Sequence, residues 1–204
     1  MNPTTLNRTR RVVGTALAAA TLAAALSACA PLIVGGAVVG GVMAVDRRTA
    51  GTQIEDEGIE LRAANRIREA LGDRAHVNVT SYNRQALLTG EVATAQDRQA
   101  VEQMVSQVEN VRSVVNDLAV MPSSTLSQRS TDTFITGKVR ASLVDAQDIS
   151  ANSFKVVTER NIVYLMGRVS QREANRATDI ARGVSDVRKV VRVFEIVSEE
   201  ELRR

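Results

Sequence analysis

The sequence predicts an α+β protein made of two tandem copies of one small αββαβ module, behind an N-terminal segment that is removed. Three observations carry this prediction. The 204-residue chain repeats its own pattern of glycines and aliphatic residues. Within each copy, apolar residues follow helical spacing in two segments and strand spacing in three. Finally, an apolar run near the N-terminus ends in small residues and the single cysteine.

Residues 1–28 have the layout of an export signal. A polar and basic stretch, 1–11, precedes an apolar run, 12–26, which is shorter than the roughly 20 residues of a membrane span. The tetrad LSAC then resembles the bacterial lipobox. We expect cleavage before Cys29 and acylation of Cys29 by a diacylglyceryl group and a fatty acid such as palmitate. The alternative is a buried structural cysteine. Ala30, in place of Asp, favours sorting to the outer membrane.

A Gly-rich apolar segment follows the cysteine. Gly36 and Gly40 form a GxxxG pattern, which in a membrane can join two helices. The apolar part that is left after cleavage, 31–45, is too short to span a bilayer. We therefore favour a tether close to the lipid anchor.

The distribution of charge argues against nucleic-acid binding. Of the 26 basic residues, three (Arg8, Arg10 and Arg11) lie in the export signal, so 23 remain against 23 acidic residues. A neutral body lacks the positive field that binds a phosphate backbone. We therefore expect no nucleic acid among the partners.

The repeat relates residues in the same order in both halves. Gly90-Glu91-Val92 pairs with Gly167-Arg168-Val169, and a set of valines near 108–115 pairs with another near 184–191. In the first helix we pair Ile67 with Val139 and Leu71 with Leu143, which implies a loop insertion further along. Gly90 and Gly167 fall late in the second strand, where we expect structural glycines at a bulge or a close backbone approach.

Each copy is expected to contain two helices and a mixed three-stranded sheet, with both helices on one face. The strands of the first copy are expected at 76–82, 86–92 and 113–120. Its helices bury Ile59, Ala63, Ile67, Ala70 and Leu71, and then Ala100, Val101, Met104, Val105 and Val108. In the second copy the core helix residues are Ile135, Val139, Leu143, Ala174, Ala177, Ala181 and Val184. The expected organisation is 1–28 signal peptide, 29–53 tether, 54–122 first module, 123–130 linker and 131–199 second module.

The module resembles the BON domain. The motifs that carry the resemblance are a strand with a late Gly-x-Val, a second helix, and V-x-x-V-x-x-V before the last strand. A lipobox followed by two such modules resembles the dual BON-domain outer-membrane lipoproteins of Gram-negative bacteria. The resemblance implies a lipid-anchored protein on the periplasmic side. It also implies binding of anionic phospholipids (cardiolipin and phosphatidylglycerol) through the second BON domain, and roles in envelope integrity and in cell-wall remodelling at the division site.

The family's lipid contact falls on the first helix of the second module, where an aromatic residue, usually Trp, follows Asp-Thr. Here that residue is Phe134, which lacks the indole N–H. Phe134 lies off the apolar stripe of its helix, and Lys138 and Arg140 follow it. We expect these three residues to contact anionic headgroups. The alternative is that Phe134 packs on the linker or the first module.

No catalytic motif is visible. His76, the single histidine, has no cysteine partner for zinc and no nucleophile for a triad, so a structural or exposed role is expected. We expect no metal, no cofactor and no enzyme activity. The alternative function is a protein-interaction adaptor for the outer-membrane assembly machinery or for amidase regulation, with lipid binding incidental.

Overall fold

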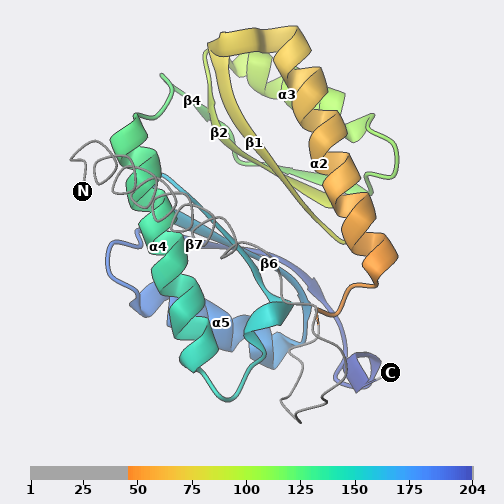
Figure 1. Ribbon diagram of the computed structural model, residues 1–204, viewed down its shortest axis with the longest axis vertical. Coiled ribbons are helices and arrows are strands. Elements are labelled where there is room, and N and C mark those ends of the chain that lie inside the picture. The colour runs from red at the N-terminus through yellow and green to blue at the C-terminus, as the bar shows by residue number, and fades with distance from the viewer. Residues whose placement is uncertain (1–45, 204) are drawn as a thin grey trace, which may run out of the picture. The chain divides into compact units, whose positions relative to one another are not determined.

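The computed structural model describes residues 46–203 (Figure 1). The expectations for the signal peptide, for Cys29 and for the pair Gly36 and Gly40 lie outside the described residues. The first module contains α2 (Ala50–Leu71), β1 (Ala75–Tyr82), β2 (Gln85–Val92), α3 (Ala95–Ser106), β3 (Ser113–Asn116) and β4 (Ala119–Val120). The second contains α4 (Leu126–Asp145), β5 (Lys155–Glu159), β6 (Ile162–Val169), α5 (Gln171–Gly183) and β7 (Lys189–Ile196). Short 3-10 turns occur at Gly72–Arg74, Ala151–Ser153 and Glu201–Arg203.

The helix caps show that both helices of the module repeat with the same spacing. Thr49 and Thr125 cap α2 and α4, and each hydroxyl accepts a hydrogen bond from the backbone N–H three residues on. Thr94 and Ser170 cap α3 and α5 in the same way. Both pairs are 76 positions apart, so the helices of the two modules are in register, whereas the hairpin turns at Asn83-Arg84 and Arg160-Asn161 are 77 positions apart.

This register corrects the pairing expected in the first helix. With a spacing of 76, Ile59 matches Ile135 and Ile67 matches Leu143, and all four are buried. The pairing of Ile67 with Val139 was wrong by one helical turn. An apolar stripe with a residue at every fourth position matches itself when it slips by a turn, so the stripe alone does not define the register.

The sheets have the expected mixed topology. β1 pairs antiparallel with β2, and β2 pairs parallel with β3; in the second module β5, β6 and β7 repeat this order. The third strand of the first module is divided in two, however, because β3 and β4 both pair with β2. Between them, the side chain of Asn116 accepts a hydrogen bond from the N–H of Leu118, and Leu118 turns into the core.

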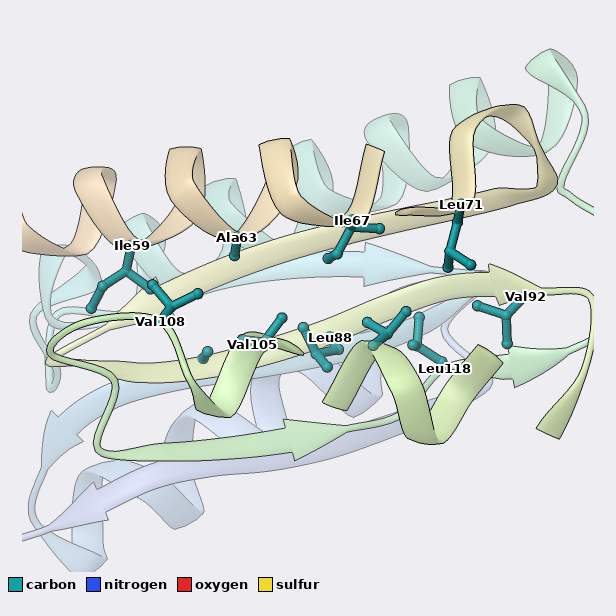
Figure 2. Close-up of a cluster of buried hydrophobic side chains, with 11 residues drawn as sticks. Ile59, Ala63, Ile67, Leu71, Leu88, Val92, Val105, Val108 and Leu118 are labelled. Carbon is teal, nitrogen blue, oxygen red and sulfur yellow. The ribbon is translucent and has the colours of Figure 1, made fainter. Parts of the chain in front are cut away.

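The core of the first module lies between its helices and one face of its sheet (Figure 2). Its members include Ile59 and Ala63 from α2, Val101 and Val105 from α3, and Leu88 from β2. Two alanines that were expected in this core, Ala70 and Ala100, are exposed. Each lies next to a larger apolar residue that fills the core position, so the helical stripe is narrower than the sequence suggested.

In the second module, α4 and α5 lie on the same face of their sheet (Figure 1). Ile135, Val139 and Leu143 of α4 pack with three alanines of α5, Ala174, Ala177 and Ala181. The small residues let α5 approach closely. The N-terminus of α5 is fastened by a capping box, in which Ser170 and Glu173 satisfy each other's backbone N–H groups.

Each hairpin turn is held by a buried aspartate from the first helix. Asn83, Arg84, Arg160 and Asn161 have positive φ, as a tight two-residue turn requires. Asp56 accepts hydrogen bonds from the N–H groups of Asn83 and Arg84 at 2.8 and 2.7 Å. Asp132 accepts the equivalent pair, from Arg160 and Asn161, at 2.9 and 2.8 Å. The aspartates thus satisfy backbone donors that the turns leave free.

The second faces of the two sheets pack against each other, within one compact unit that includes all the described residues, 46–203. Tyr82 and Leu87 of the first module form an apolar cluster with Tyr164, Met166 and Val193 of the second. The hydroxyl of Tyr164 donates a 2.7 Å hydrogen bond to Asp117, across the interface. Each sheet therefore has helices on one face and the other module on the opposite face.

Candidate functional site: an exposed helix face and a polar cluster between the modules

Phe134 projects from the outer face of α4. Its side chain is 67% exposed, whereas its neighbour Ile135 is fully buried. The ammonium group of Lys138, one turn further on, lies 4.8 Å from the centroid of the Phe134 ring. The expected aromatic and the expected cation therefore lie together on one surface.

The charge of Lys138 is shared with the loop after α5. Its Nζ atom donates to the hydroxyl of Ser185 at 2.7 Å and to the carboxylate of Asp186 at 2.9 Å. The hydrogen bond from Lys138 holds the pKa of Asp186 below its usual value. The carboxylate of Asp186 therefore competes with any anionic ligand for the ammonium group of Lys138, and this carboxylate is exposed to solvent.

Arg140 lies on the other side of α4. Lys138 reaches the loop that leads into β7, whereas the guanidinium of Arg140 approaches the carbonyl oxygen of Val156 in β5. Because β5 and β7 are the two edges of the sheet, these cations point in opposite directions. The structure brings Phe134 and Lys138 together and leaves Arg140 apart from them.

The two glycines of the second strands lie where another backbone passes closely. Gly90 has a φ of 109°, and a Cβ atom there would collide with the carbonyl oxygen of His76. A Cβ atom on Gly167 would collide with the carbonyl oxygen of Ser153. Both positions admit the neighbouring chain because they lack a side chain.

A polar cluster that was not predicted from the sequence lies at the module interface. His76 of β1, Glu91 of β2 and Glu159 of β5 each place one potential ligand atom within 4.8 Å of the others. The Nδ1 atom of His76 is 3.0 Å from Oε2 of Glu91. The sequence carried no clear signal, because strand alternation puts these residues on the face away from the helices, where polar side chains are ordinary unless that face is also covered.

Both carboxylates of this cluster are buried. Burial raises the pKa of Glu159, and the charge of Glu91 raises it further, while a hydrogen bond from Asn78 acts in the opposite direction. Asn78 donates to Oε2 of Glu159 at 2.9 Å, which is also a bond between modules. The cluster therefore concentrates negative charge in a place with little water.

Arg47 also joins the two modules, although it precedes the first. Its guanidinium makes a bidentate ion pair with Glu173 of α5, in which Nη2 donates to Oε1 at 2.7 Å and Nη1 donates to Oε2 at 2.8 Å. Nη1 also donates to the carbonyl oxygen of Arg168. The hydrogen bond from Arg47 lowers the pKa of Glu173. The start of the described chain is thus fastened to the second module.

Cys29 lies outside the described residues, so its environment is not visible. In the described residues, 46–203, no helix has the length and apolar character of a membrane span.

The chain is similar to known proteins over most of its length. The model of the BON domain family matches residues 59–122 and 131–198. "Outer membrane lipoprotein DolP" of Haemophilus influenzae is 36% identical over 171 residues, which are 83% of this chain and 89% of the relative. "21 kDa hemolysin" of Actinobacillus pleuropneumoniae is 34% identical over 155 residues, 75% of this chain and 80% of the relative. "Osmotically-inducible protein Y" of Escherichia coli is 42% identical over 60 residues, 29% and 30% of the two chains.

Proposed function

Since the chain belongs to the BON domain family, we propose that its second module binds anionic phospholipid through the outer face of α4, with Phe134 and Lys138 as the contacts. The chain is an outer-membrane lipoprotein of this family, in line with its likeness to the Haemophilus lipoprotein. On this proposal Cys29 carries the lipid anchor, the modules face the periplasm, and lipid recognition supports envelope integrity and cell-wall remodelling at division.

The observation that carries the proposal is the exposed Phe134 ring beside the Lys138 ammonium. Exposure of an apolar ring to water is unfavourable, and its transfer to the boundary between headgroups and acyl chains is favourable. A cation next to it suits the phosphate of an anionic headgroup, at a gain of about 1 kcal/mol near the surface. In the same place on α2, 76 residues earlier, the first module has Gly58. The proposal therefore assigns lipid binding to the second module.

The experiment measures flotation with cardiolipin-containing vesicles. It uses a chain that begins at residue 46, so that an N-terminal acyl group cannot mask the contact. We expect Phe134→Glu to abolish flotation, because it replaces the inserting ring with a negative charge, which the anionic lipid repels. Asp186→Asn should strengthen flotation, because it frees Lys138 from its carboxylate partner.

Ile54→Glu in α2 is the matched control. Ile54 is 70% exposed, close to the value for Phe134, but it lies in the first module. It should not affect flotation. Equal losses in Phe134→Glu and Ile54→Glu would contradict the proposal, and so would unchanged flotation of Phe134→Glu in a protein with unchanged circular dichroism.

A protein-interaction adaptor is the second candidate, and the outer face of α2 favours it. Ile54 and Leu61 are 70% and 64% exposed, and a separation of seven residues puts them on one side of the helix. A partner helix could cover this stripe. Leu61→Glu should then weaken capture of an envelope partner and leave vesicle flotation unchanged, whereas Phe134→Glu should do the reverse.

A further inference from the structure

We propose that His76, Glu91 and Glu159 form a site for one divalent transition-metal cation, with zinc as the best match, and that the bound ion joins the two modules. The proposal is independent of lipid binding. Its ligands come from three strands, of which β1 and β2 belong to the first module and β5 to the second.

Strand alternation explains why these three side chains converge. His76 and Glu91 are directly opposite each other in the antiparallel ladder, so their side chains lie on the same face. That face carries Leu87 of the interface cluster, and the equivalent face of β5 carries Val157. Glu159 is two residues after Val157 and therefore points the same way. Packing of the two sheets then brings the three side chains together.

The distances suit a small metal ion after modest side-chain rotation. The three potential ligand atoms lie within 4.8 Å of one another. Around tetrahedral zinc, with bonds of about 2.1 Å, neighbouring ligand atoms lie roughly 3.4 Å apart. His76 Nδ1 and Glu91 Oε2 are already 3.0 Å apart, so the pair needs to open slightly and Glu159 needs to approach.

The carboxylate of Glu91 is incompletely satisfied by its present contacts, which is a second, independent sign of a cation site. The residue is 1% exposed, and its Oε1 atom is buried without a hydrogen bond. The Nε atom of Arg160 is 3.4 Å away and is itself buried without a hydrogen-bond partner. A long ion pair without a hydrogen bond stabilises a buried carboxylate incompletely, and a cation bound through Oε2 would add to the charge that Arg160 supplies at Oε1.

The net charge of the cluster favours the binding of a divalent cation. Two buried carboxylates face one guanidinium, that of Arg160, and a neutral imidazole would leave the cluster with a net negative charge. The nearby carboxylate of Asp132 is already occupied by two turn N–H groups. A divalent ion would neutralise the two glutamates, while Arg160 could stay beside Oε1 of Glu91.

Neighbouring groups already orient the ligands. Asn78 donates to Oε2 of Glu159 at 2.9 Å, and the backbone N–H of Ser124 donates to Oε2 of Glu91 at 3.0 Å. Such supporting hydrogen bonds are a regular feature of metal sites. Glu91 also lines a cleft of about 580 Å³ with Arg160 and the segment around Ser124, which gives an ion a route from solvent.

The donor set selects the kind of metal. One imidazole nitrogen and two carboxylate oxygens suit zinc and other borderline transition metals, whereas magnesium and calcium prefer oxygen ligands alone. Three protein ligands leave a position for water from the cleft. The ion would replace the His76–Glu91 hydrogen bond with two metal bonds and add one bond to Glu159 in the other module.

The test measures zinc binding by the full chain in detergent, with Cys29→Ser in every sample so that a Cys29 thiol left without its lipid cannot compete. We expect one zinc ion per chain and a higher thermal unfolding midpoint with zinc than with a chelator. His76→Gln, Glu91→Gln and Glu159→Gln should each weaken binding at least about tenfold, since the loss of supporting groups alone costs about that much. Equal affinity in these three variants and in the parent chain would overturn the proposal.

Glu60→Gln is the matched control. Glu60 binds Lys155 of the second module at 2.7 Å, so it also bridges the modules, but it lies outside the cluster. It should lower the unfolding midpoint without changing zinc affinity. Loss of zinc binding in Glu60→Gln as large as in His76→Gln would show that any loosening of the interface suffices, and would overturn the site.

A measurement on the chain with an intact cluster guards against variants that fail to fold. Because His76 is the single histidine, ¹⁵N-histidine labelling gives the ring signals of this residue alone. Zinc at one equivalent should shift the resonance of a His76 ring nitrogen. An unchanged His76 spectrum at saturating zinc would refute the proposal.

Discussion

The first helices of the two modules have the same inner face and different outer faces. On the inner side, α2 and α4 present Asp56 and Asp132 to a hairpin turn, and Ile59 and Ile135 to the core. On the outer side α4 exposes Phe134, where α2 has Gly58. The comparison shows that the repeat preserves what the fold needs, while function can diverge on the surface that the fold leaves free.

The strongest way to test the shared inner face is to remove its aspartates. We expect Asp56→Ala to lower the free energy of unfolding by roughly 4 kcal/mol and Asp132→Ala by roughly 3 kcal/mol, since each leaves two turn N–H groups without acceptors. The larger effect at Asp56 reflects two further partners, Ser81 and Arg48. Urea unfolding measures both.

An exposed aspartate provides the control for that experiment. Asp179→Ala on the surface of α5 should change the free energy of unfolding by less than about 0.5 kcal/mol. If Asp132→Ala were as mild as Asp179→Ala, the two turns would not depend on the same device, and the comparison of inner faces would fail.

The glycines test whether the modules store the same backbone constraint. Gly90→Ala should cost about 3 kcal/mol, because it meets both an unfavourable φ and the His76 carbonyl. Gly167→Ala should cost about 2 kcal/mol, because its methyl group would meet the Ser153 carbonyl and, less closely, Val169, without the unfavourable φ of Gly90. Gly137→Ala in α4, where a methyl group meets nothing, should instead stabilise by about 0.5–1 kcal/mol. The order of thermal midpoints checks this, and a reversed order of Gly90 and Gly167 would contradict it.

The smallest expected effect concerns acid sensitivity at the start of α5. Arg47 lowers the pKa of Glu173, so this pair stabilises the fold above the pKa of an unfolded glutamate, about 4.3, and the contribution is lost as the pH falls through the lower folded value. Arg47→Ala should cost roughly 1 kcal/mol at neutral pH, after allowance for solvent screening, and almost nothing in strong acid. Urea unfolding over a pH series measures the difference.

Arg182→Ala is the control for the acid experiment. Arg182 is on the same helix, is exposed, and makes a loose surface pair with Asp179 at 3.7 Å. Its removal should have little effect at any pH. The parent chain and Arg47→Ala should differ less in free energy of unfolding as the pH falls. A difference that stays constant would show that the stabilisation by Arg47 does not depend on the ionised form of Glu173.

Much of each module could be predicted from the sequence, because the determining signals are local. Apolar spacing gave both core stripes of the helices, and the turn residues located the hairpins at Asn83 and at Arg160-Asn161. The exposure of Phe134 follows from its position one residue before the buried Ile135. Successive residues of a helix are rotated by about 100°, so Phe134 lies off the buried face. The exact helix register was not available, since a regular stripe matches itself after a slip of one turn.

The two αββαβ modules of the BON family and the exposed aromatic residue on the second could be predicted from the amino-acid sequence. The packing of the two sheets through Tyr82, Leu87 and Tyr164, and the meeting of His76, Glu91 and Glu159 there, became visible only in the folded chain. The difference lies in how far apart along the chain the interacting residues are. Helical and strand periodicity is written within a few neighbouring residues, whereas the partner of a sheet face depends on which surfaces from distant parts of the chain can exclude water together.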